Sequence, residues 1–265
     1  MNTLTSEQWE ALRDLRTICP DTSVALIGGS ALAWHNRLGG RETEDLDLTV
    51  AISLDSLRRR LQAAPGWTPD PRQAQRWRYK NAALVDLLPS TNQLIAAGEV
   101  VWPDSGTTMS LVGFDHVHTY GLPITADDPL LKVASLPTLA LLKVVSYLDR
   151  PTARAKDLQD LTLLMDRYLD DDDDRLYIGA ASDEELWNEE ANTYLLGLDI
   201  GRMLTDEEHA LLQQFIAKAR DRDDVHHTQA VLTRRAPLSW ERNIETTLRR
   251  LTLLERGLLK GRAAD

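Results

Sequence analysis

The sequence predicts an α/β (α+β) domain with a mixed sheet over residues 1–130, followed by an α-helical bundle domain over residues 131–265. Two observations lead to this fold class. Short strand-like runs alternate with helix-like runs as far as residue 125. From Pro137 onward, apolar residues recur instead at the spacing of amphipathic helices, and no long linker separates the two patterns.

The first half opens with a predicted helix, strand and helix. Residues 6–18, SEQWEALRDLRTI, have helical spacing, and Ser6 is a suitable N-cap. VALIG (24–28) predicts a short buried strand that stops at two glycines. Ser30 then stands where a serine could cap a helix over 31–38.

The alternation continues through the next elements. DLDLTV (45–50) has the period of two that is typical of a strand, and Ser53 precedes the helical segment LDSLRRRLQAA. After a turn rich in Pro and Gly, RWRYKN and ALVDLL (83–88) predict a pair of strands. Further strand-like pieces follow between residues 100 and 125.

The second half predicts helices separated by polar segments. They are LPTLALLKVVSYLDR, ARAKDLQDLTLLMDRYL, EANTYLLGLDIGRML, DEEHALLQQFIAKARD and ERNIETTLRRLTLLERGLL. The acidic run 170–174 is expected to be a solvated loop, because the glycine and the ligand spacing of a calcium-binding EF-hand are missing.

Composition limits the kinds of partner. The net charge of −11 argues against a general nucleic-acid-coating protein, whose affinity depends on many phosphate contacts. The acids concentrate in 169–190 while 58–80 is rich in arginine, so a local basic face and a polyanionic substrate are still allowed. Cys19 is the only cysteine, which excludes an internal disulfide. With no signal-peptide pattern and no apolar run of about 20 residues, we expect a cytoplasmic protein that does not enter the membrane.

Three aspartates are candidate metal ligands. Asp45 and Asp47 lie two apart on a predicted strand, so their side chains leave the same face, where they repel unless a cation joins them. Asp86 stands within the apolar strand 83–88, and if that strand lies beside the first, three carboxylates converge. Three oxygen donors suit Mg²⁺ whose remaining ligands are water and a nucleoside triphosphate (NTP). Two such ions would activate an acceptor hydroxyl and hold the leaving pyrophosphate.

The turn Gly28-Gly29-Ser30 is a candidate phosphate site. Glycines at a strand-to-helix junction let backbone N–H groups approach a phosphate, and a helix N-terminus favours negative charge. A Walker A loop is excluded because no G-K-[ST] follows, and the Rossmann pattern G-x-G-x-x-G is absent. The ordered series of strand, G-G-S, helix, R-x-T-x-D-x-D and a later strand aspartate is more specific than any of its parts.

This series resembles the polymerase-β-like nucleotidyltransferase superfamily. Within it, GGSALAWH…RETEDLDL is most similar to the AbiEii/AbiGii-type nucleotidyltransferase toxins of bacterial abortive-infection and type IV toxin–antitoxin systems. LALLKVVSYLDRPTARAKDLQDLTLLM (139–165) is similar to that family's helical motif, in which a Lys is followed by an Arg and then by K-D-x-x-D. The two matches frame residues 26–165, and the remaining C-terminal part carries no motif that we can assign.

The resemblance implies roles at the matching positions only. The expected triphosphate contacts are Gly28, Gly29, Ser30 and Lys143. Asp45 and Asp47 would hold the metals, and Asp86 would complete the metal site or act as the base that deprotonates the acceptor hydroxyl. Lys143 would stabilise the charge of the leaving pyrophosphate.

The helical domain would also contribute a carboxylate to the active site. The resemblance implies Asp157 in this role, with Asp160 as its alternative and Lys156 and Arg154 as weaker candidates. Without the resemblance, Lys143 reads equally well as a solvated flank, and the two aspartates as an exposed helix edge.

Three further features have open interpretations. Arg41 would bind phosphate or pair with neighbouring acids. His116 and His118, in DHVH, would share one face of a strand, and we expect surface or core histidines there because a third metal ligand is missing. Trp77 could stack on a base, although a half-buried strand with a basic face is favoured.

The expected activity is Mg²⁺-dependent transfer of a nucleoside monophosphate from an NTP to an acceptor. The family resemblance implies an RNA acceptor, a tRNA 3′ end, and a separate antitoxin protein as partner. Transfer to a small molecule of the aminoglycoside type, or to a protein, stays open, since an acidic cleft suits a polycationic acceptor. A non-catalytic interaction module ranks last, because all three aspartates are present.

Overall fold

The computed structural model describes residues 4–37, 43–184 and 186–263. The chain forms two compact units, Met1–Leu139 and Ala140–Asp265, and the boundary between them falls inside helix α6 (Leu136–Asp149). The domain boundary expected at residue 130 stays a prediction. In the part of the chain that the structure describes, no helix is both long and apolar enough to cross a membrane.

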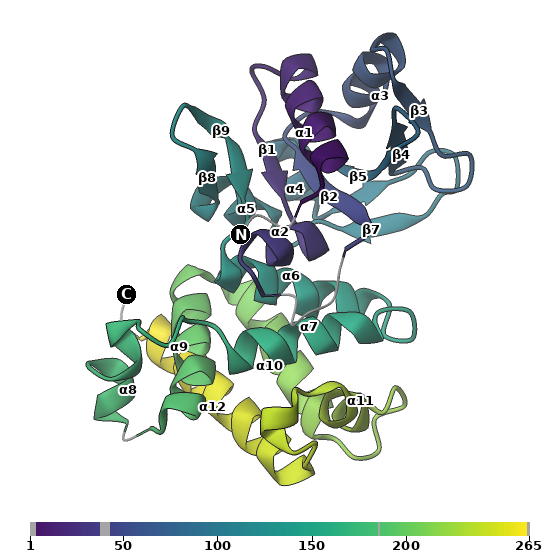
Figure 1. Cartoon of the computed structure of the whole chain (residues 1–265). Coiled ribbons are helices and arrows are strands. Elements are labelled where there is room, and N and C mark those ends of the chain that lie inside the picture. The colour runs from purple at the N-terminus through teal and green to yellow at the C-terminus, as the bar shows by residue number, and fades with distance from the viewer. Residues whose placement is uncertain (1–3, 38–42, 185, 264–265) are drawn as a thin grey trace. The chain divides into compact units, whose positions relative to one another are not determined.

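Within the described residues of the first unit, seven strands form one mixed sheet in the order β3–β4–β5–β2–β1–β9–β8 (Figure 1). The strands are β1 (Val24–Leu26), β2 (Asp45–Val50), β3 (Trp67–Pro69), β4 (Arg76–Tyr79), β5 (Ala83–Pro89), β8 (Leu122–Thr125) and β9 (Asp128–Val133). β2 pairs with β5, and β1 with β9, in parallel, while the other neighbours are antiparallel. The predicted mixed sheet is therefore confirmed.

Helices pack on the apolar surface of this sheet. The first unit contains α1 (Ser6–Ile18), α2 (Gly28–Trp34), α3 (Leu54–Ala63), α4 (Asn92–Ala97) and α5 (Phe114–Tyr120), with a separate ribbon of β6 (Glu99–Val101) and β7 (Thr108–Ser110). α1 and α3 pack on β5. Leu46 and Leu48 of β2 are fully buried, whereas Asp45 and Asp47 between them are only half-buried. The alternation therefore places both carboxylates on the other face.

The N-terminal helix is capped one residue earlier than expected. The Thr5 hydroxyl accepts a hydrogen bond from the Gln8 backbone N–H at 3.2 Å, and the Gln8 side chain accepts one from the Thr5 N–H at 2.9 Å. This reciprocal capping box makes Thr5 the N-cap and Ser6 the first helical residue. The prediction of Ser6 as N-cap was wrong by one position.

The DHVH segment is helical, so the expected strand at His116 and His118 was wrong. Phe114 and Val117 are buried three residues apart, which is the spacing of a helix face. His116 is buried, as a core histidine would be. His118 makes hydrogen-bond contacts from Nε2 to Ser90 Oγ at 2.8 Å and from Nδ1 to Ser23 Oγ at 3.1 Å.

The second unit is helical, as predicted. Its helices are α6, which begins in the first unit, α7 (Ala155–Asp166), α8 (Ala180–Asp183), α9 (Asn188–Met203), α10 (Asp206–Arg220), α11 (Thr228–Arg235) and α12 (Ile244–Arg262), with 3₁₀ turns at Asp174–Leu176 and Leu238–Trp240. α11 was not expected. The acidic run behaves as a loop: Asp171 and Asp172 are exposed, and Asp173 accepts from the Arg175 N–H at 2.9 Å.

The long helices α9 and α12 approach through four glycines. Gly197 and Gly201 on α9 face the backbone of α12, and Gly257 and Gly261 on α12 face the backbone of α9. A Cβ atom added at Gly257 would lie 2.1 Å from the Tyr194 carbonyl oxygen. The absence of side chains at these four positions thus sets how closely the two backbones pack.

Candidate active site

The three candidate metal ligands meet on neighbouring strands. Parallel pairing of β2 with β5 places Asp47 directly opposite Asp86, and Asp45 lies two residues along the same face. One carboxylate oxygen from each of the three lies within 4.8 Å of the other two. The predicted convergence of Asp45, Asp47 and Asp86 is confirmed as geometry.

This oxygen set fits a divalent cation. Around Mg²⁺, with ligands at about 2.0–2.1 Å, neighbouring and opposite oxygens lie about 3–4 Å apart. The spread of the three carboxylates is close to that range, so the three oxygens fit as part of the shell of one ion whose other ligands are water and the NTP. The residues that would hold the ion are therefore Asp45, Asp47 and Asp86.

A residue that sequence reasoning missed, Arg76, bridges two of these carboxylates. Its Nε donates to Asp86 Oδ1 at 2.7 Å, and its Nη2 donates to Asp86 Oδ2 at 2.8 Å and to Asp45 Oδ2 at 2.7 Å. The hydrogen bonds to Asp86, followed by the charges of Asp86, Asp45 and Asp47, raise the pKa of Arg76. The guanidinium of Arg76 therefore carries a permanent positive charge beside the three carboxylates.

The pairing of Arg76 with Asp86 could have been predicted from the hairpin of β4 and β5. β4 and β5 are antiparallel, and Tyr79 pairs with Ala83 next to the turn that joins them. Counting three residues away from the turn on each strand therefore pairs Arg76 with Asp86. Placing the turn correctly would have predicted this pair. Trp77, the neighbour of Arg76, is buried, so the base-stacking role considered for it was wrong.

The Gly28-Gly29-Ser30 turn holds the aspartate pair in place. The Gly29 N–H donates to Asp47 Oδ2 at 2.8 Å. The buried Ser30 hydroxyl donates to the Asp45 carbonyl at 3.1 Å and accepts from the Asp47 N–H at 2.8 Å. Gly28 has φ of 55°, and a Cβ there would lie 2.5 Å from Asp47 Oδ2. This close approach requires glycine.

Ser30 is not the helix cap that the sequence suggested. α2 begins at Gly28, and its N-cap is Ile27, which makes no side-chain capping bond. Ser30 lies inside the first turn, where its hydroxyl bonds the start of β2 instead. The triphosphate contacts expected of Gly28, Gly29 and Ser30 stay predictions.

The second unit holds a separate buried charge cluster. Lys143 Nζ lies 2.8 Å from Asp157 Oδ1 and 2.6 Å from Asp160 Oδ2, and the Ser146 hydroxyl donates to Asp157 Oδ2 at 3.0 Å. Burial alone would lower the pKa of Lys143, but the charges of Asp157 and Asp160 raise it overall. The ammonium is therefore held in its charged form by two carboxylates.

Burial decides between the readings of this cluster. Lys143, Asp157 and Asp160 are 7%, 2% and 1% exposed, so the alternatives of a solvated flank and an exposed helix edge were wrong. Lys156 is exposed, and Arg154 is the N-cap of α7. The catalytic roles expected of Lys143 and Asp157 stay predictions.

The candidate sites thus form two groups, one in each unit. The first unit holds Asp45, Asp47, Asp86 and the glycine turn, and the second holds the group around Lys143. Arg41, considered as a phosphate ligand, lies outside the described residues.

Comparison with protein families supports the sequence resemblance. The model of the family described as "Nucleotidyl transferase AbiEii toxin, Type IV TA system" matches residues 11–249. No curated protein matches the chain, and no solved structure does. The matched range contains the aspartate cluster, the glycine turn and the Lys143 group. The chain therefore belongs to the AbiEii family of nucleotidyl transferase toxins of type IV toxin–antitoxin systems and is an NTP-dependent nucleotidyltransferase.

Proposed function

We propose that the protein transfers a nucleoside monophosphate from an NTP to an RNA acceptor, a tRNA 3′ end, in a reaction that depends on Mg²⁺, with two ions expected. The observation that carries the metal dependence is the convergence of Asp45, Asp47 and Asp86 within 4.8 Å. In the reaction, an acceptor hydroxyl oxygen bonds to the α-phosphorus, and the bond from that phosphorus to the pyrophosphate oxygen breaks.

The protein's part in the first unit is to keep the carboxylates in position. Gly29 bonds the Asp47 carboxylate, and Ser30 bonds the Asp47 N–H and the Asp45 carbonyl, so the positions of these two residues are set before substrate arrives. When bound there, divalent cations supply Lewis-acid stabilisation of the attacking and leaving oxygens. Asp86 completes the ligand set or accepts the proton of the acceptor hydroxyl.

In the second unit, we assign the positive charge for the triphosphate to Lys143. Asp157 and Asp160 hold its ammonium at 2.8 and 2.6 Å, which fixes its position and keeps it protonated. Asp157 has the further support of the Ser146 hydroxyl. The family resemblance is the support for Asp157 as an active-site carboxylate of the helical unit.

The family implies a toxin with an antitoxin protein as partner and an NTP as substrate. A bacterial toxin of this kind would act in the cytoplasm. The family resemblance supports our proposal of RNA as the acceptor. A polycationic small molecule is the second candidate, because acidic residues outnumber Lys and Arg by 41 to 30.

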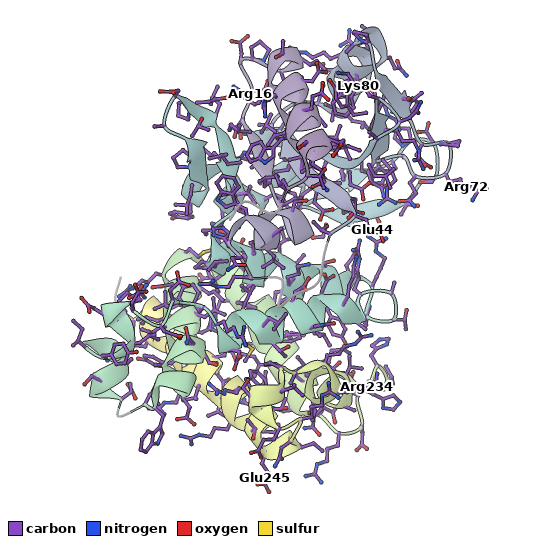
Figure 2. All side chains as sticks on the ribbon, viewed as in Figure 1. Arg16, Glu44, Arg72, Lys80, Arg234 and Glu245 are labelled. Carbon is purple, nitrogen blue, oxygen red and sulfur yellow. The ribbon has the colours of Figure 1, made fainter. Side chains whose placement is uncertain are left out.

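A label-transfer experiment tests the proposal. The purified protein is incubated with Mg²⁺ and each α-³²P-labelled NTP in turn, with total RNA, an aminoglycoside mixture, a bacterial protein extract or no added acceptor. Asp47→Ala removes one proposed ligand. Glu44→Ala is the matched control, since Glu44 is an exposed carboxylate next to the start of β2 (Figure 2).

We expect label in tRNA-sized RNA with wild type and Glu44→Ala, and none with Asp47→Ala or with EDTA. Label in the aminoglycoside or protein pool would replace the RNA acceptor with the corresponding alternative. Equal labelling by Asp47→Ala and wild type would contradict the role of the aspartate cluster.

A further inference from the structure

A positively charged side chain of the protein already neutralises part of the aspartate cluster. The Arg76 guanidinium uses both oxygens of Asp86 and one oxygen of Asp45, at distances of 2.7–2.8 Å. These are short, charge-assisted hydrogen bonds with the two-pronged geometry in which arginine binds carboxylates most strongly. Arg76 therefore stabilises the close approach of two like charges in the metal-free protein.

The same contacts oppose the binding of a divalent cation. A cation that ligates Asp45 and Asp86 needs oxygen lone pairs toward which Arg76 now donates. In addition, a guanidinium and a dication a few ångströms apart repel each other strongly at a partly buried site. Both effects act on the oxygens that the metal site requires.

The surroundings of Arg76 allow its side chain to move without its strand. Its neighbours Trp77 and Tyr79 are buried and anchor β4, which pairs with β3 and β5 on its two sides. The Arg76 side chain itself is 20% exposed and reaches the carboxylates over a long, flexible stem. Displacement of the guanidinium would therefore leave the sheet intact.

We propose that Arg76 is the internal counter-ion of the metal-binding carboxylates: it holds Asp45 and Asp86 together in the metal-free enzyme and competes with divalent cations for them. Metal loading then includes the release of Arg76 from Asp45 and at least part of Asp86. Arg76 is a positioning residue in this scheme. The inference rests on the proposed function, since it assumes that the cluster binds metal.

Metal affinity measured without catalysis tests the proposal. Mn²⁺ binding to the full chain is followed by electron paramagnetic resonance of free Mn²⁺, at constant ionic strength and without nucleotide. The variants are Arg76→Gln, Arg76→Lys, Arg78→Gln and Asp47→Asn. Arg78→Gln is the matched control: it removes the same charge from an exposed position two residues along β4. The Mn²⁺ binding that is lost in Asp47→Asn is the binding that occurs at the aspartate cluster.

We expect Arg76→Gln to bind Mn²⁺ at least ~5-fold more tightly than wild type, because a nearby competing charge is removed. Arg78→Gln should change the affinity less than ~2-fold, because an exposed charge is screened by salt. Arg76→Lys, which keeps the charge but loses the planar fork, should fall between wild type and Arg76→Gln.

A thermal unfolding experiment shows whether the Arg76→Gln protein is folded. Arg76→Gln should unfold at a lower temperature than wild type in EDTA, and Mn²⁺ should restore more stability to it than to wild type, because the ion replaces the lost counter-ion. Weaker or unchanged Mn²⁺ binding by a folded Arg76→Gln protein would overturn the role of Arg76 but leave the proposed metal site standing. If wild type and Asp47→Asn bind Mn²⁺ equally, the proposed metal site fails, and the inference fails with it.

Discussion

At the scale of single residues, Asp47 shows how local contacts hold a proposed metal ligand in position. The Gly29 N–H bonds its carboxylate, the Ser30 hydroxyl accepts from its N–H, and its carbonyl accepts from the Ile27 N–H at 3.0 Å. The turn that follows β1 therefore fixes both the side chain and the peptide of Asp47. Gly28 makes this possible, since any side chain there would occupy the space of the carboxylate.

The substitution Gly28→Ala tests this arrangement. We expect transferase activity to fall about 100-fold, as for a displacement of roughly 1 Å in a reactive group, because the new Cβ would push Asp47 aside. Gly98→Ala is the control: Gly98 has φ of 76° and no atom within 4 Å of its added Cβ. Both variants should lose about 1 kcal/mol of stability from backbone strain. Equal activity of the two proteins in the label-transfer assay would contradict the clash with Asp47.

At the scale of elements, the packing of α9 on α12 depends on backbone contact. Gly197 and Gly201 on one helix, and Gly257 and Gly261 on the other, are each spaced four apart, so each pair lies on one face of its helix. The close approach increases contact between the two helices, although each glycine has a lower intrinsic helix propensity than alanine.

We predict that Gly257→Ala lowers the free energy of unfolding by about 2–3 kcal/mol, the upper part of the range for overpacked cores. The added methyl group would lie 2.1 Å from the Tyr194 carbonyl, in rigid backbone that cannot move aside cheaply. Lys260→Ala, at an exposed position of the same helix, should change stability by no more than ~0.5 kcal/mol. Urea unfolding of the three proteins measures the difference, and similar midpoints for both variants would refute the tight contact.

The unexpected helix α11 depends on a buried aspartate just before it. Asp224 accepts from the Thr228 N–H and hydroxyl and lies 2.6 Å from Lys218 Nζ. Burial opposes the charged form, but the hydrogen bonds from Lys218 and Thr228 lower the pKa of Asp224 to about 2. The folded pKa lies below that of the unfolded chain, so Asp224 stabilises the fold above pH 4, and the effect is lost as the pH falls toward 2.

We therefore expect Asp224→Asn to destabilise the protein by about 2 kcal/mol at pH 7, following the size of the pKa shift. The difference from wild type should shrink steadily between about pH 4 and pH 2. Urea unfolding at a series of pH values measures it. A difference that does not vary with pH would show that Asp224 acts by its shape and not by its charge.

At the scale of the whole molecule, charge limits how the acceptor can bind. With 41 acidic residues against 30 Lys and Arg, the protein repels a long polyanion except where basic residues gather locally. An RNA acceptor would then be held through few phosphates, near the nucleotide that receives the NMP.

This view predicts a weak salt dependence of tRNA binding. For the Asp47→Ala protein, which we expect to be inactive, the slope of log K against log salt should be about −2 to −4, since each neutralised phosphate contributes about −0.7 to −0.9. Filter binding over about 50–200 mM KCl gives the slope. A value near −8 would reveal an extended basic surface that the composition does not suggest.

The sequence by itself determined the family, the fold class and the shared face of Asp45 and Asp47, whereas the arrival of Asp86 beside them depended on the pairing of β2 with β5. Period-two alternation placed Asp45 and Asp47 on one face, and the apolar residues around Asp86 predicted a strand there. These features depend on neighbours within a few residues, which sequence patterns record directly.

The tertiary structure alone decided which groups these residues meet. Arg76 bridges Asp86 and Asp45 through strand register, the Ser30 hydroxyl bonds β2 instead of capping a helix, and Lys143 is enclosed with two aspartates between α6 and α7. Each of these contacts joins elements whose pairing comes from burial of the apolar surface of the whole unit. A local pattern shows that a side chain is polar, but only the fold determines which charge lies next to it.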